Sequence, residues 1–483
     1  MEDTEHIPES LDAARWLMLG LVCAGTFMGT LDISIVNVAL PTLTRAFNTH
    51  VAVSQWFVLA YTFVITVFLL TFGRLGDLVG RRCIYVAGTI VFVAGSLACG
   101  LSVSALMLIV SRAVQGLGSA VTMSAGPALV TGSFPSSERG KALGFIGTSV
   151  ALGLLAGPVI GGFLVQFASW RWLFLINVPI GLALALTLGL RFCGSFAAAH
   201  GRMDIRGSAL LALSLSALVL GLTYGGRVGW TSPATAAVFA LGMVLGAAFV
   251  YVERQTSSPL LDLRLFSNRE FAIGTVTGWA NYAAMMPVSV FLPFYLENLL
   301  KLRPDRVGLV LASGPLVLAF TAPAAGTLSD RIGSRLLTSV GLLIAAAAIL
   351  SMRWLSTGSA WHDVVWRLAL ASFGSALFVS PNSSAIMGAV RPGQLGVASG
   401  AIALARNLGM LCGIAVGGAI ISTAQQSFFF TGELHPTPEL RHYSFFVGLR
   451  GVFLASGGIA LFGAFLSALR VRPGDREAFE RGC

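Results

Sequence analysis

The sequence predicts an all-α integral membrane protein made of two six-helix bundles and two extra helices, with fourteen transmembrane helices in all. Of its 483 residues, 55% are apolar and only 11% are charged, which is too little charge to cover a water-soluble protein of this size. Apolar runs of about 20 residues, the length that a spanning helix needs, follow one another along the chain. This arrangement leaves no room for a large soluble domain and excludes most classes of enzyme.

The apolar runs are bounded by charged residues or by clusters of Gly and Pro, and they form groups of six, two and six. The first group covers 14–40, 51–73, 83–102, 105–131, 139–166 and 172–193; the pair covers 207–226 and 233–252; the last group covers 271–298, 307–328, 336–355, 364–388, 395–423 and 446–469. We therefore expect an N-terminal bundle over residues 1–200, a two-helix insert with an inner linker over 201–265, and a C-terminal bundle with a cytoplasmic tail over 266–483.

The basic residues predict the orientation of the helices. With the N-terminus inside, nineteen of the 31 basic residues fall in inner segments, nine in outer segments and three within spans. Both termini are therefore expected in the cytoplasm, in the inner (plasma) membrane of the cell. The net charge of +10 is scattered singly between apolar segments, so we expect no nucleic-acid partner. The six cysteines form no CxxC pattern and no zinc-like spacing, so we expect free thiols and no metal site.

A ten-residue loop occurs after the second helix of the first group and again after the second helix of the last group, as Gly73–Arg82 and as residues 326–335. The first copy, GRLGDLVGRR, resembles the cytoplasmic signature G-x-L-x-D-x-x-G-R-R of the major facilitator superfamily, and this resemblance implies the major facilitator fold. Asp77 can pair with Arg81 or cap a neighbouring helix N-terminus. The gate that we predict from both copies consists of Gly73, Asp77, Gly80, Arg81, Arg82, Asp330 and Arg331; the alternative is a positively charged turn.

The first predicted span carries one carboxylate, Asp32, inside an almost uninterrupted apolar helix. An ionised Asp at mid-membrane costs about 2.5–3.5 kcal/mol, so we expect Asp32 to change its protonation as water access alternates. It shares a helical stripe with Gly25 and Gly29, which favours a position facing a crevice; the alternative is an Asp that reaches the outer surface near Pro41. The segment Leu31–Pro41 resembles the first-helix signature of the fourteen-helix drug:proton antiporters, in which the matching Asp is implicated in coupling.

The fourth predicted span places Arg112, Gln115 and Ser119 on one polar stripe of an apolar helix. A permanent cation there favours the ionised form of a nearby carboxylate, so Arg112 can help Asp32 to release its proton. The segment resembles the R-x-x-Q-G motif of the superfamily, which assigns Arg112 a role in proton transfer. The alternative is an Arg that only satisfies the carbonyls of a neighbouring helix end.

The fifth predicted span has a glycine at every fourth position and a proline beside the second of them, which predicts a smooth packing face with a kink. It resembles the antiporter motif of the superfamily, which is seen chiefly in exporters and is thought to seal the interface between the halves. The residues concerned are Gly153, Gly157, Pro158, Gly161 and Gly162. Together with Trp170–Gly181, which also matches the family, this segment favours an exporter over an importer.

The residues that contact a substrate are less clearly marked. The span at 271–298 has Trp279, Tyr282 and Met286 on one face, and we expect Pro287 and Pro293 to break it. Such residues suit an adaptable apolar cavity, although a Met and aromatic stripe more often packs against other helices. Arg406 begins a further stripe that resembles the fourteen-helix family, and it either orients a gate or anchors a helix end. The weakly predicted cavity residues are Asn37, Gln55, Tyr61, Gln115, Trp279, Asn281, Tyr282, Met285, Met286 and Arg406.

These motifs occur in the expected order over nearly the whole chain, and together they resemble the QacA-like and EmrB-like multidrug exporters. The resemblance implies a drug:proton antiporter that exports lipophilic, cationic or neutral compounds by alternating access, driven by the proton gradient and without a cofactor. We expect a monomer in the lipid bilayer, and the sequence leaves open whether a periplasmic adaptor binds. The alternatives are a dedicated exporter of one metabolite, antibiotic or lipid-like compound, an uptake symporter, and a non-transporting sensor or scaffold. A membrane enzyme is disfavoured because the spans show no catalytic constellation.

Overall fold

The computed structural model describes residues 9–135, 138–192, 203–256, 259–391, 394–429 and 438–470, and over these ranges the regular structure is helical. The first group of helices is α1 (Glu9–Ala46), α2 (Val51–Ser54), α3 (Trp56–Val79), α4 (Arg81–Gly100), α5 (Ala105–Ser133), α6 (Arg139–Phe167), α7 (Trp172–Leu175) and α8 (Asn177–Phe192). A pair follows, α9 (Ile205–Val228) and α10 (Pro233–Gln255), with the 3₁₀ turn η1 (Leu263–Ser267). The last group is α11 (Arg269–Phe294), the π-helical turn η2 (Tyr295–Leu299), α12 (Pro304–Ile332), α13 (Ser334–Ser351), the 3₁₀ turn η3 (Met352–Trp354), α14 (Trp361–Gly388), α15 (Leu395–Phe429) and α16 (Pro438–Ala468). This order confirms the predicted fold class.

Thirteen helical segments of the described chain are long and apolar enough to cross a membrane. The one predicted span that is not among these thirteen, 271–298, corresponds to α11, whose 26 residues are also long enough to cross a membrane. This helix is less apolar than the others because it carries Asn281 and several small polar residues. The polar character of α11 matters below, because this helix lines the central cavity.

The prediction that Pro287 and Pro293 break this span is wrong, because α11 continues through both residues to Phe294. Membrane helices tolerate proline where neighbouring helices and local adjustments satisfy the freed carbonyl groups. Here the local adjustment of the helix is the π-helical turn η2, into which the chain passes from α11 at Tyr295. A sequence pattern shows the missing N–H of proline but not the packing that compensates for it.

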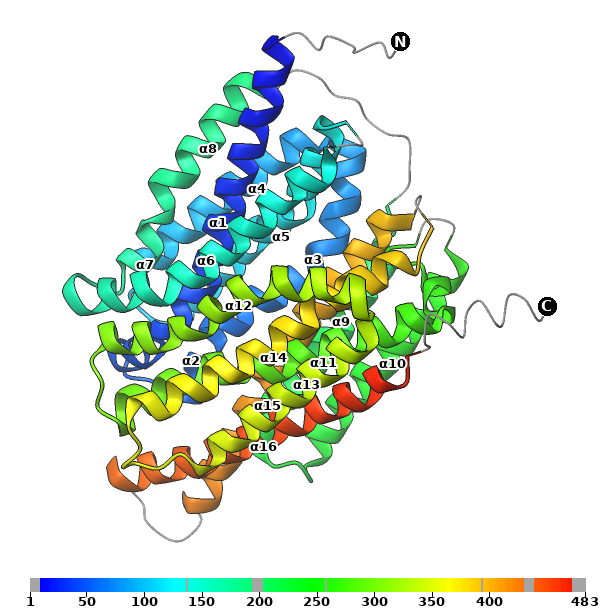
Figure 1. The fold of residues 1–483 in the computed structure, drawn as a ribbon. Helices are drawn as coiled ribbons and strands as arrows, with labels where there is room; N and C mark the ends of the chain where they lie inside the picture. Colours follow the sequence, from blue (N-terminus) through cyan, green and yellow to red (C-terminus); the bar gives the residue numbers. More distant parts are fainter. Residues whose placement is uncertain are drawn as a thin grey trace, which may run out of the picture.

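The two bundles meet at one end of the molecule and diverge toward the other. Figure 1 shows this divergence, with α1 and α8 on one side and α13 and α16 on the other. We call these the Arg45 end, where α1 finishes, and the loop end, where both ten-residue loops lie. At the Arg45 end a single buried apolar cluster contains residues of both bundles, such as Phe57 and Phe294. At the loop end the bundles have separate clusters, one around Phe134 and one around Phe271. The molecule is therefore closed at the Arg45 end.

The two halves repeat the same backbone features. In both ten-residue loops the residue between the helices is a glycine with positive φ, +106° at Gly80 and +85° at Gly333, a conformation that other residues rarely adopt. Two contacts between the halves join residues that are 252 positions apart, namely the hydrogen bond from Asn37 to Ser289 and the ion pair of Arg45 with Glu297. Equivalent positions of α1 and α11 thus face each other across an approximate twofold axis.

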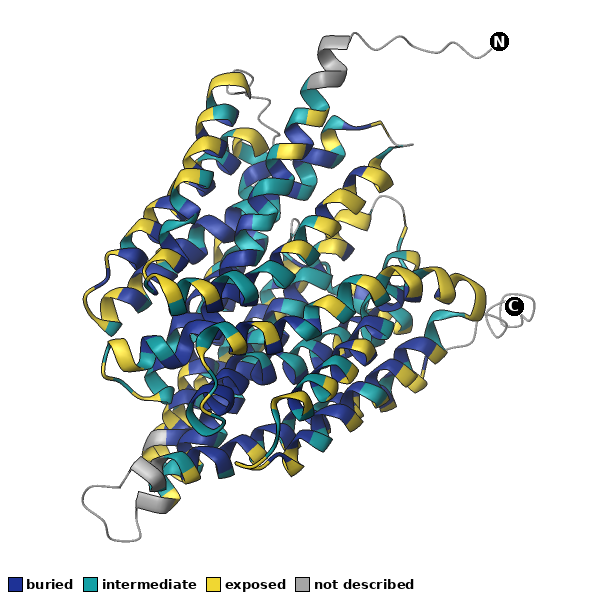
Figure 2. Cartoon of the chain, turned by 60° about the vertical axis from the view of Figure 1, so that its left-hand side comes forward, coloured by how far each residue is buried: buried dark blue, intermediate teal, exposed yellow. Residues whose placement is uncertain are grey.

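Exposed residues follow the outer faces of the helices, whereas buried residues gather between them (Figure 2). Many exposed side chains are large and apolar, among them Leu190, Phe320 and Leu106, which suits a surface covered by lipid. Helix α9 packs against α3 and α15, so it lies along the seam between the two halves, and α10 packs on α9. The side chain of Trp230, in the turn between them, donates a hydrogen bond to Thr423 of α15.

Candidate functional site

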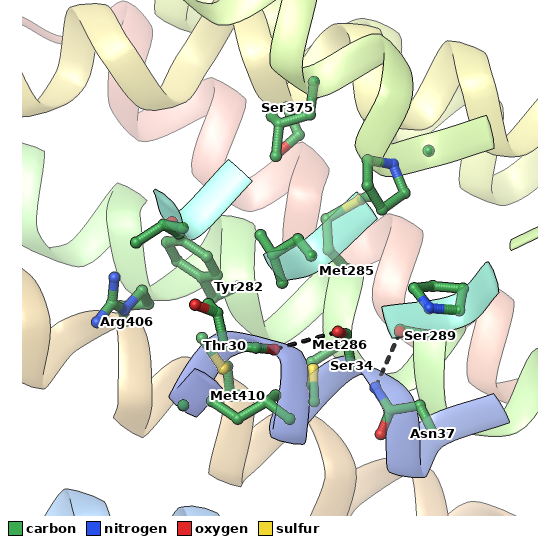
Figure 3. A pocket seen from close by; sticks show the side chains of 18 of the residues that line it. Thr30, Ser34, Asn37, Tyr282, Met285, Met286, Ser289, Ser375, Arg406 and Met410 are labelled. Carbon is green, nitrogen blue, oxygen red and sulfur yellow. Dashed lines mark hydrogen bonds between the residues drawn. The ribbon is translucent and has the colours of Figure 1, made fainter. Parts of the chain in front are cut away.

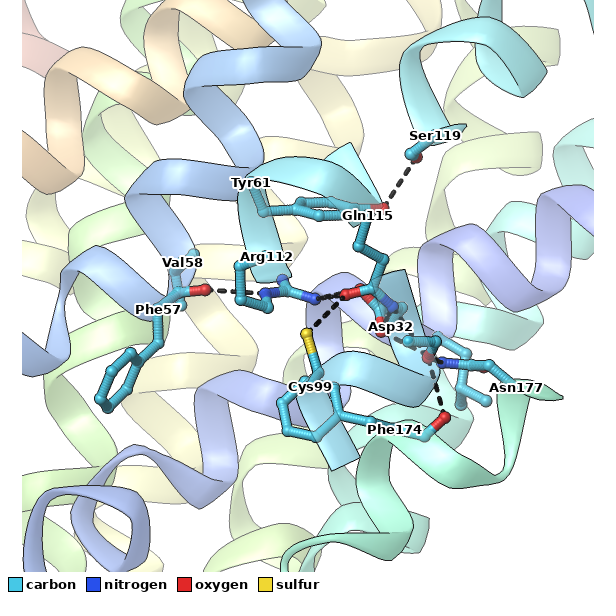
Figure 4. Close-up of polar contacts among 12 residues, drawn as sticks. Asp32, Phe57, Val58, Tyr61, Cys99, Arg112, Gln115, Ser119, Phe174 and Asn177 are labelled. Atoms are coloured by element: carbon cyan, nitrogen blue, oxygen red, sulfur yellow. Dashed lines mark hydrogen bonds and ion pairs between the residues drawn. The ribbon is translucent and has the colours of Figure 1, made fainter. Parts of the chain in front are cut away.

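Asp32 lies inside the N-terminal bundle, in an ion pair with Arg112 in which both side chains have no exposed surface. Nη1 of Arg112 is 2.5 Å from Oδ2 of the carboxylate, and Nε2 of Gln115 donates to Oδ1 at 2.8 Å. Asn177, at the start of α8, donates to the same oxygen at 3.1 Å. Helices α1, α5 and α8 therefore supply the carboxylate and its three donors (Figure 4).

Arg112 is fixed by four groups at once. Its Nε donates to the carbonyl of Phe57 at 2.8 Å, and its Nη1 donates to Oε1 of Gln115 at 2.6 Å as well as to Asp32. Its guanidinium lies 4.1 Å from the centre of the Tyr61 ring, a cation–π contact. The remaining nitrogen, Nη2, has no hydrogen-bond partner among the described residues.

The sequence patterns did not single out two residues of this network, Asn177 and Ser96. Ser96 of α4 accepts hydrogen bonds from Gln115 at 3.0 Å and from Asn177 at 3.3 Å, and it donates to the carbonyl of Phe174 at 2.8 Å. Both residues are fully buried. A signal for Asn177 was present, because it is the polar residue within an apolar segment that matches the family, whereas a lone serine in a membrane helix gives none.

The network meets the hydrogen-bonding needs of the buried Asp32 carboxylate. A buried carboxylate is stable only when it is paired and its oxygens accept hydrogen bonds, and here a guanidinium and two amides meet that need. Removing one partner of a comparable buried ion pair costs about 3–5 kcal/mol, because the other charge is left unpaired. In this conformation the network shields Asp32 from solvent.

Asp32 does not lie in the wall of the central cavity, contrary to the expectation from its helical stripe. The face of α1 that lines the cavity carries Thr30, Ile33 and Ser34 instead. Gly25 and Gly29 of the predicted stripe do line the cavity, whereas the Asp32 side chain is directed to Arg112 and Gln115 of α5. Asp32 and the cavity are thus on different faces of one helix.

The cavity lies between the two bundles, lined by α1, α5 and α6 on one side and by α11, α12, α14 and α15 on the other, and it has a volume of about 380 Å³ (Figure 3). This size falls within the range of sites for drug-sized ligands. Of the weakly predicted residues, six line it: Asn37, Asn281, Tyr282, Met285, Met286 and Arg406.

The other four weakly predicted residues lie elsewhere. Tyr61 and Gln115 belong to the Arg112 network, and Gln55 is buried against Gly418 of α15 at the Arg45 end. The backbone of Trp279 faces Gly409, where α11 and α15 pack closely. The residues Thr26, Thr30, Asn407 and Ser289, which the patterns did not single out, line the cavity in their place.

The glycines of α6 serve two different contacts. Gly153, Gly157 and Gly161 face α1, where a Cβ on Gly157 would come within 1.8 Å of Oγ of Ser34. Gly162 faces the other half instead, with its Cα in close contact with Gly308 of α12. The stripe therefore packs mainly within its own bundle, and only Gly162 and the carbonyl of Pro158 meet the opposite bundle.

The ten-residue loop of the N-terminal half holds its charges within that half. Asp77 forms an ion pair with Arg81 at 2.8 Å, and Arg81 also donates to the carbonyl of Ala128 in α5 at 3.2 Å. In the second copy, Asp330 and Arg331 lie exposed at the end of α12. The contacts of Asp77 and Arg81 thus stay within the N-terminal bundle.

A second buried cluster lies at the loop end of the C-terminal bundle. The side chain of Arg470, which has no exposed surface, is 3.6 Å from Oε1 of Glu270 and donates to Asn382 and to Thr277. Burial lowers the pKa of the Arg470 guanidinium, and the neighbouring Glu270 raises it. This cluster joins the beginning of α11 to the end of α16.

Comparisons with known proteins agree with this architecture. The sequence model of the Major Facilitator Superfamily matches residues 22–414 and 274–482. The riboflavin transporter RibZ of Clostridioides difficile is 32% identical over 466 residues, covering 96% of this chain and 99% of its own. The multidrug resistance protein Stp of Mycobacterium tuberculosis is 34% identical, covering 89% and 80%, and the methylenomycin A resistance protein of Streptomyces coelicolor is 29% identical, covering 97% and 95%.

Solved structures share the fold. A bacterial homologue of the human lysosomal transporter Spinster, described as inward-facing and unoccupied, superimposes with a TM-score of 0.68 at 17% sequence identity, covering 95% of this chain and 99% of that one. A transporter of the POT family in complex with 5-aminolevulinic acid gives a TM-score of 0.67 at 15% identity, covering 92% and 94%. At these identities the likeness concerns the fold alone.

Proposed function

Because this chain belongs to the major facilitator superfamily and is a multi-pass membrane transporter, we propose that it is a proton-coupled exporter of the fourteen-helix drug:proton antiporter type. The names of its relatives, which include multidrug and antibiotic resistance proteins, support export. In this proposal the protein lies in the cell membrane as a monomer with both termini in the cytoplasm, so that the loop end is cytoplasmic. The structure then corresponds to a state that is closed to the outside.

One observation carries the proposal. Among the described residues, the only charged network buried between α1, α5 and α8 is the one that joins Asp32 to Arg112. This network lies on a different face of α1 from the cavity. A proton and a substrate therefore do not compete for the same atoms. We propose that they act on the same helix, since α1 carries Asp32 on one face and Thr30 and Ser34 on the face that lines the cavity. Asp32 would take up a proton while the outer end is open and would release it to the cytoplasm in the inward-open state, where its pairing with Arg112 holds α1.

The test is substrate-dependent proton movement in proteoliposomes that contain a pH-sensitive dye. We expect Asp32→Asn to bind substrate and to lose the proton flux, because Asn keeps the size of the side chain but cannot exchange a proton. Asp262→Asn is the matched control, since Asp262 caps η1 through a backbone N–H and Asn caps equally well. Wild-type proton flux in Asp32→Asn would exclude Asp32 as the coupling group.

A dedicated exporter of one compound is the second candidate, and one relative named for a single compound, the riboflavin transporter, favours it. A panel of unrelated compounds distinguishes the two. A multidrug exporter moves protons in response to several of them, whereas a dedicated exporter responds to one.

A further inference from the structure

The central cavity contains one charged side chain. Among the described residues that line it, Arg406 of α15 carries a positive charge, and no Asp or Glu is present. Asp32 does not compensate for this charge, since it lies behind α1 and is paired with Arg112. A cavity with a single uncompensated cation attracts an anion and repels a cation.

The position of Arg406 is set by the close packing of α15 on α11. Gly409, one turn further along α15, lies against the carbonyl of Trp279 and against Tyr282, and both Arg406 and Tyr282 line the cavity (Figure 3). Arg406 also borders a smaller pocket of about 30 Å³ that contains Asn382. Its Nε is buried and has no hydrogen-bond partner in the described chain.

Two amides that line the same cavity are also unsatisfied. Asn281 is 1% exposed, and neither its nitrogen nor its oxygen has a partner; Asn407 is 4% exposed, and its nitrogen has none. Buried polar groups without partners are unfavourable, and natural proteins retain them mainly where a ligand or water completes them. The nitrogens of Arg406, Asn281 and Asn407 together provide several N–H donors and so match a ligand rich in acceptors.

The rest of the wall combines hydroxyl side chains with adaptable apolar ones, among them Met123, Met285, Met286 and Met410. We propose that the cavity binds lipophilic organic anions: Arg406 pairs with a carboxylate, sulfonate or phenolate, Asn281 and Asn407 donate to it, and the methionines enclose the apolar body. This inference rests on the proposed function and specifies the substrate class of the same site. It replaces the expectation of a cationic or neutral substrate, which the sequence suggested through family resemblance alone.

Tetraphenylborate and tetraphenylphosphonium test the proposal, because they have nearly the same shape and opposite charges. We expect the purified protein in a non-ionic maltoside detergent to bind tetraphenylborate saturably and at least tenfold more tightly than tetraphenylphosphonium. In Arg406→Gln this preference is lost, whereas Arg406→Lys, which keeps the charge, retains part of it. Arg353→Gln is the matched control, since it removes one exposed Arg far from the cavity lining and should bind as the wild type does.

Equal or tighter binding of tetraphenylphosphonium by the wild-type protein would overturn the proposal, and so would an unchanged preference in Arg406→Gln. The binding measurement requires no gradient, so it is independent of proton coupling. If anions bind through Arg406 but move no protons, the cavity assignment stands and the proposed function fails. If a lipophilic cation exchanges for protons in the wild type and the anion does not, the proposed function stands and the anion site fails.

Discussion

At the scale of single residues, the pairing of Asp32 with Arg112 is the contact that the sequence indicated most directly. A lone carboxylate and a lone guanidinium in apolar helices are each unstable, so an ion pair between them was a reasonable expectation, and the structure brings their atoms within 2.5 Å. The patterns did not single out Asn177, although its segment matches the family, and a lone serine such as Ser96 leaves no periodic trace in a membrane helix. Their roles depend on which helices meet, which is a property of tertiary packing.

The glycines of α6 give a prediction at the same scale. In Gly157→Ala the new Cβ would lie 1.8 Å from Oγ and 2.7 Å from Cβ of Ser34, so the helices must separate. We expect this overpacking to cost about 1–3 kcal/mol and to lower the melting temperature of the protein in detergent.

Gly147→Ala on the same helix is the control for Gly157→Ala. No atom lies within 4 Å of the position of its Cβ, so the substitution should leave the melting temperature unchanged or raise it slightly through the better helix propensity of Ala. Equal melting temperatures for the two variants would show that α1 and α6 pack less closely than described.

At the scale of elements, the two halves use the same arrangement of helices with different side chains. Gly409, Gly413 and Gly417 of α15 pack on α11 as the glycines of α6 pack on α1, and Gly418, like Gly162, faces the opposite bundle. The sequence showed this repeat only in the ten-residue loops, because the glycine stripes are short and glycine is common in membrane helices. The equivalence became visible once the contact partners of each glycine were known.

The contact of α6 with α12 predicts a shift between conformations. A Cβ at Gly162 would lie 2.5 Å from the carbonyl oxygen of Pro304, a backbone atom that cannot move away alone, so Gly162→Ala should separate the halves at the Arg45 end. With spin labels at the exposed positions Val79 and Ile332, at the loop end, we expect a larger population of short distances in this variant.

Gly418→Ala provides the comparison within the same repeat. Its Cβ would meet the end of the Gln55 side chain, which can change its rotamer, so the distance distribution should stay close to that of the wild type. If the two variants gave the same distribution, the α6–α12 contact would not control closure of the Arg45 end.

At the scale of the whole molecule, the two halves carry different charged groups. The N-terminal bundle holds the ion pair that we assign to proton coupling, and the C-terminal bundle holds Arg406, the charged residue of the cavity wall. The contacts between the halves join positions that are 252 residues apart. By this spacing, Ala284 is the position of α11 that corresponds to Asp32. In our proposal, an approximately symmetric fold therefore separates proton binding from substrate binding.

This separation predicts how transport responds to a membrane potential. If one organic anion leaves for each proton that enters, two positive charges move inward per cycle, and each contributes about 2.3 kcal/mol per 100 mV. In proteoliposomes with equal pH on both sides, a potassium diffusion potential that is negative on the cytoplasmic side of the protein should therefore drive export of the anion. A one-for-one exchange of a cation for a proton moves no net charge, so an absence of any effect of the potential would contradict the anion assignment.

The contacts along the approximate twofold axis have a mechanical consequence. When two rigid bodies rotate about a shared axis, the separation of two points changes in proportion to their distance from that axis. Asn37 and Ser289 lie beside the cavity, whereas Arg45 and Glu297 lie two turns further along at the closed end. A short covalent cross-link between positions 37 and 289 should accordingly be compatible with turnover, while the same link between positions 45 and 297 should arrest the protein with its outer side shut.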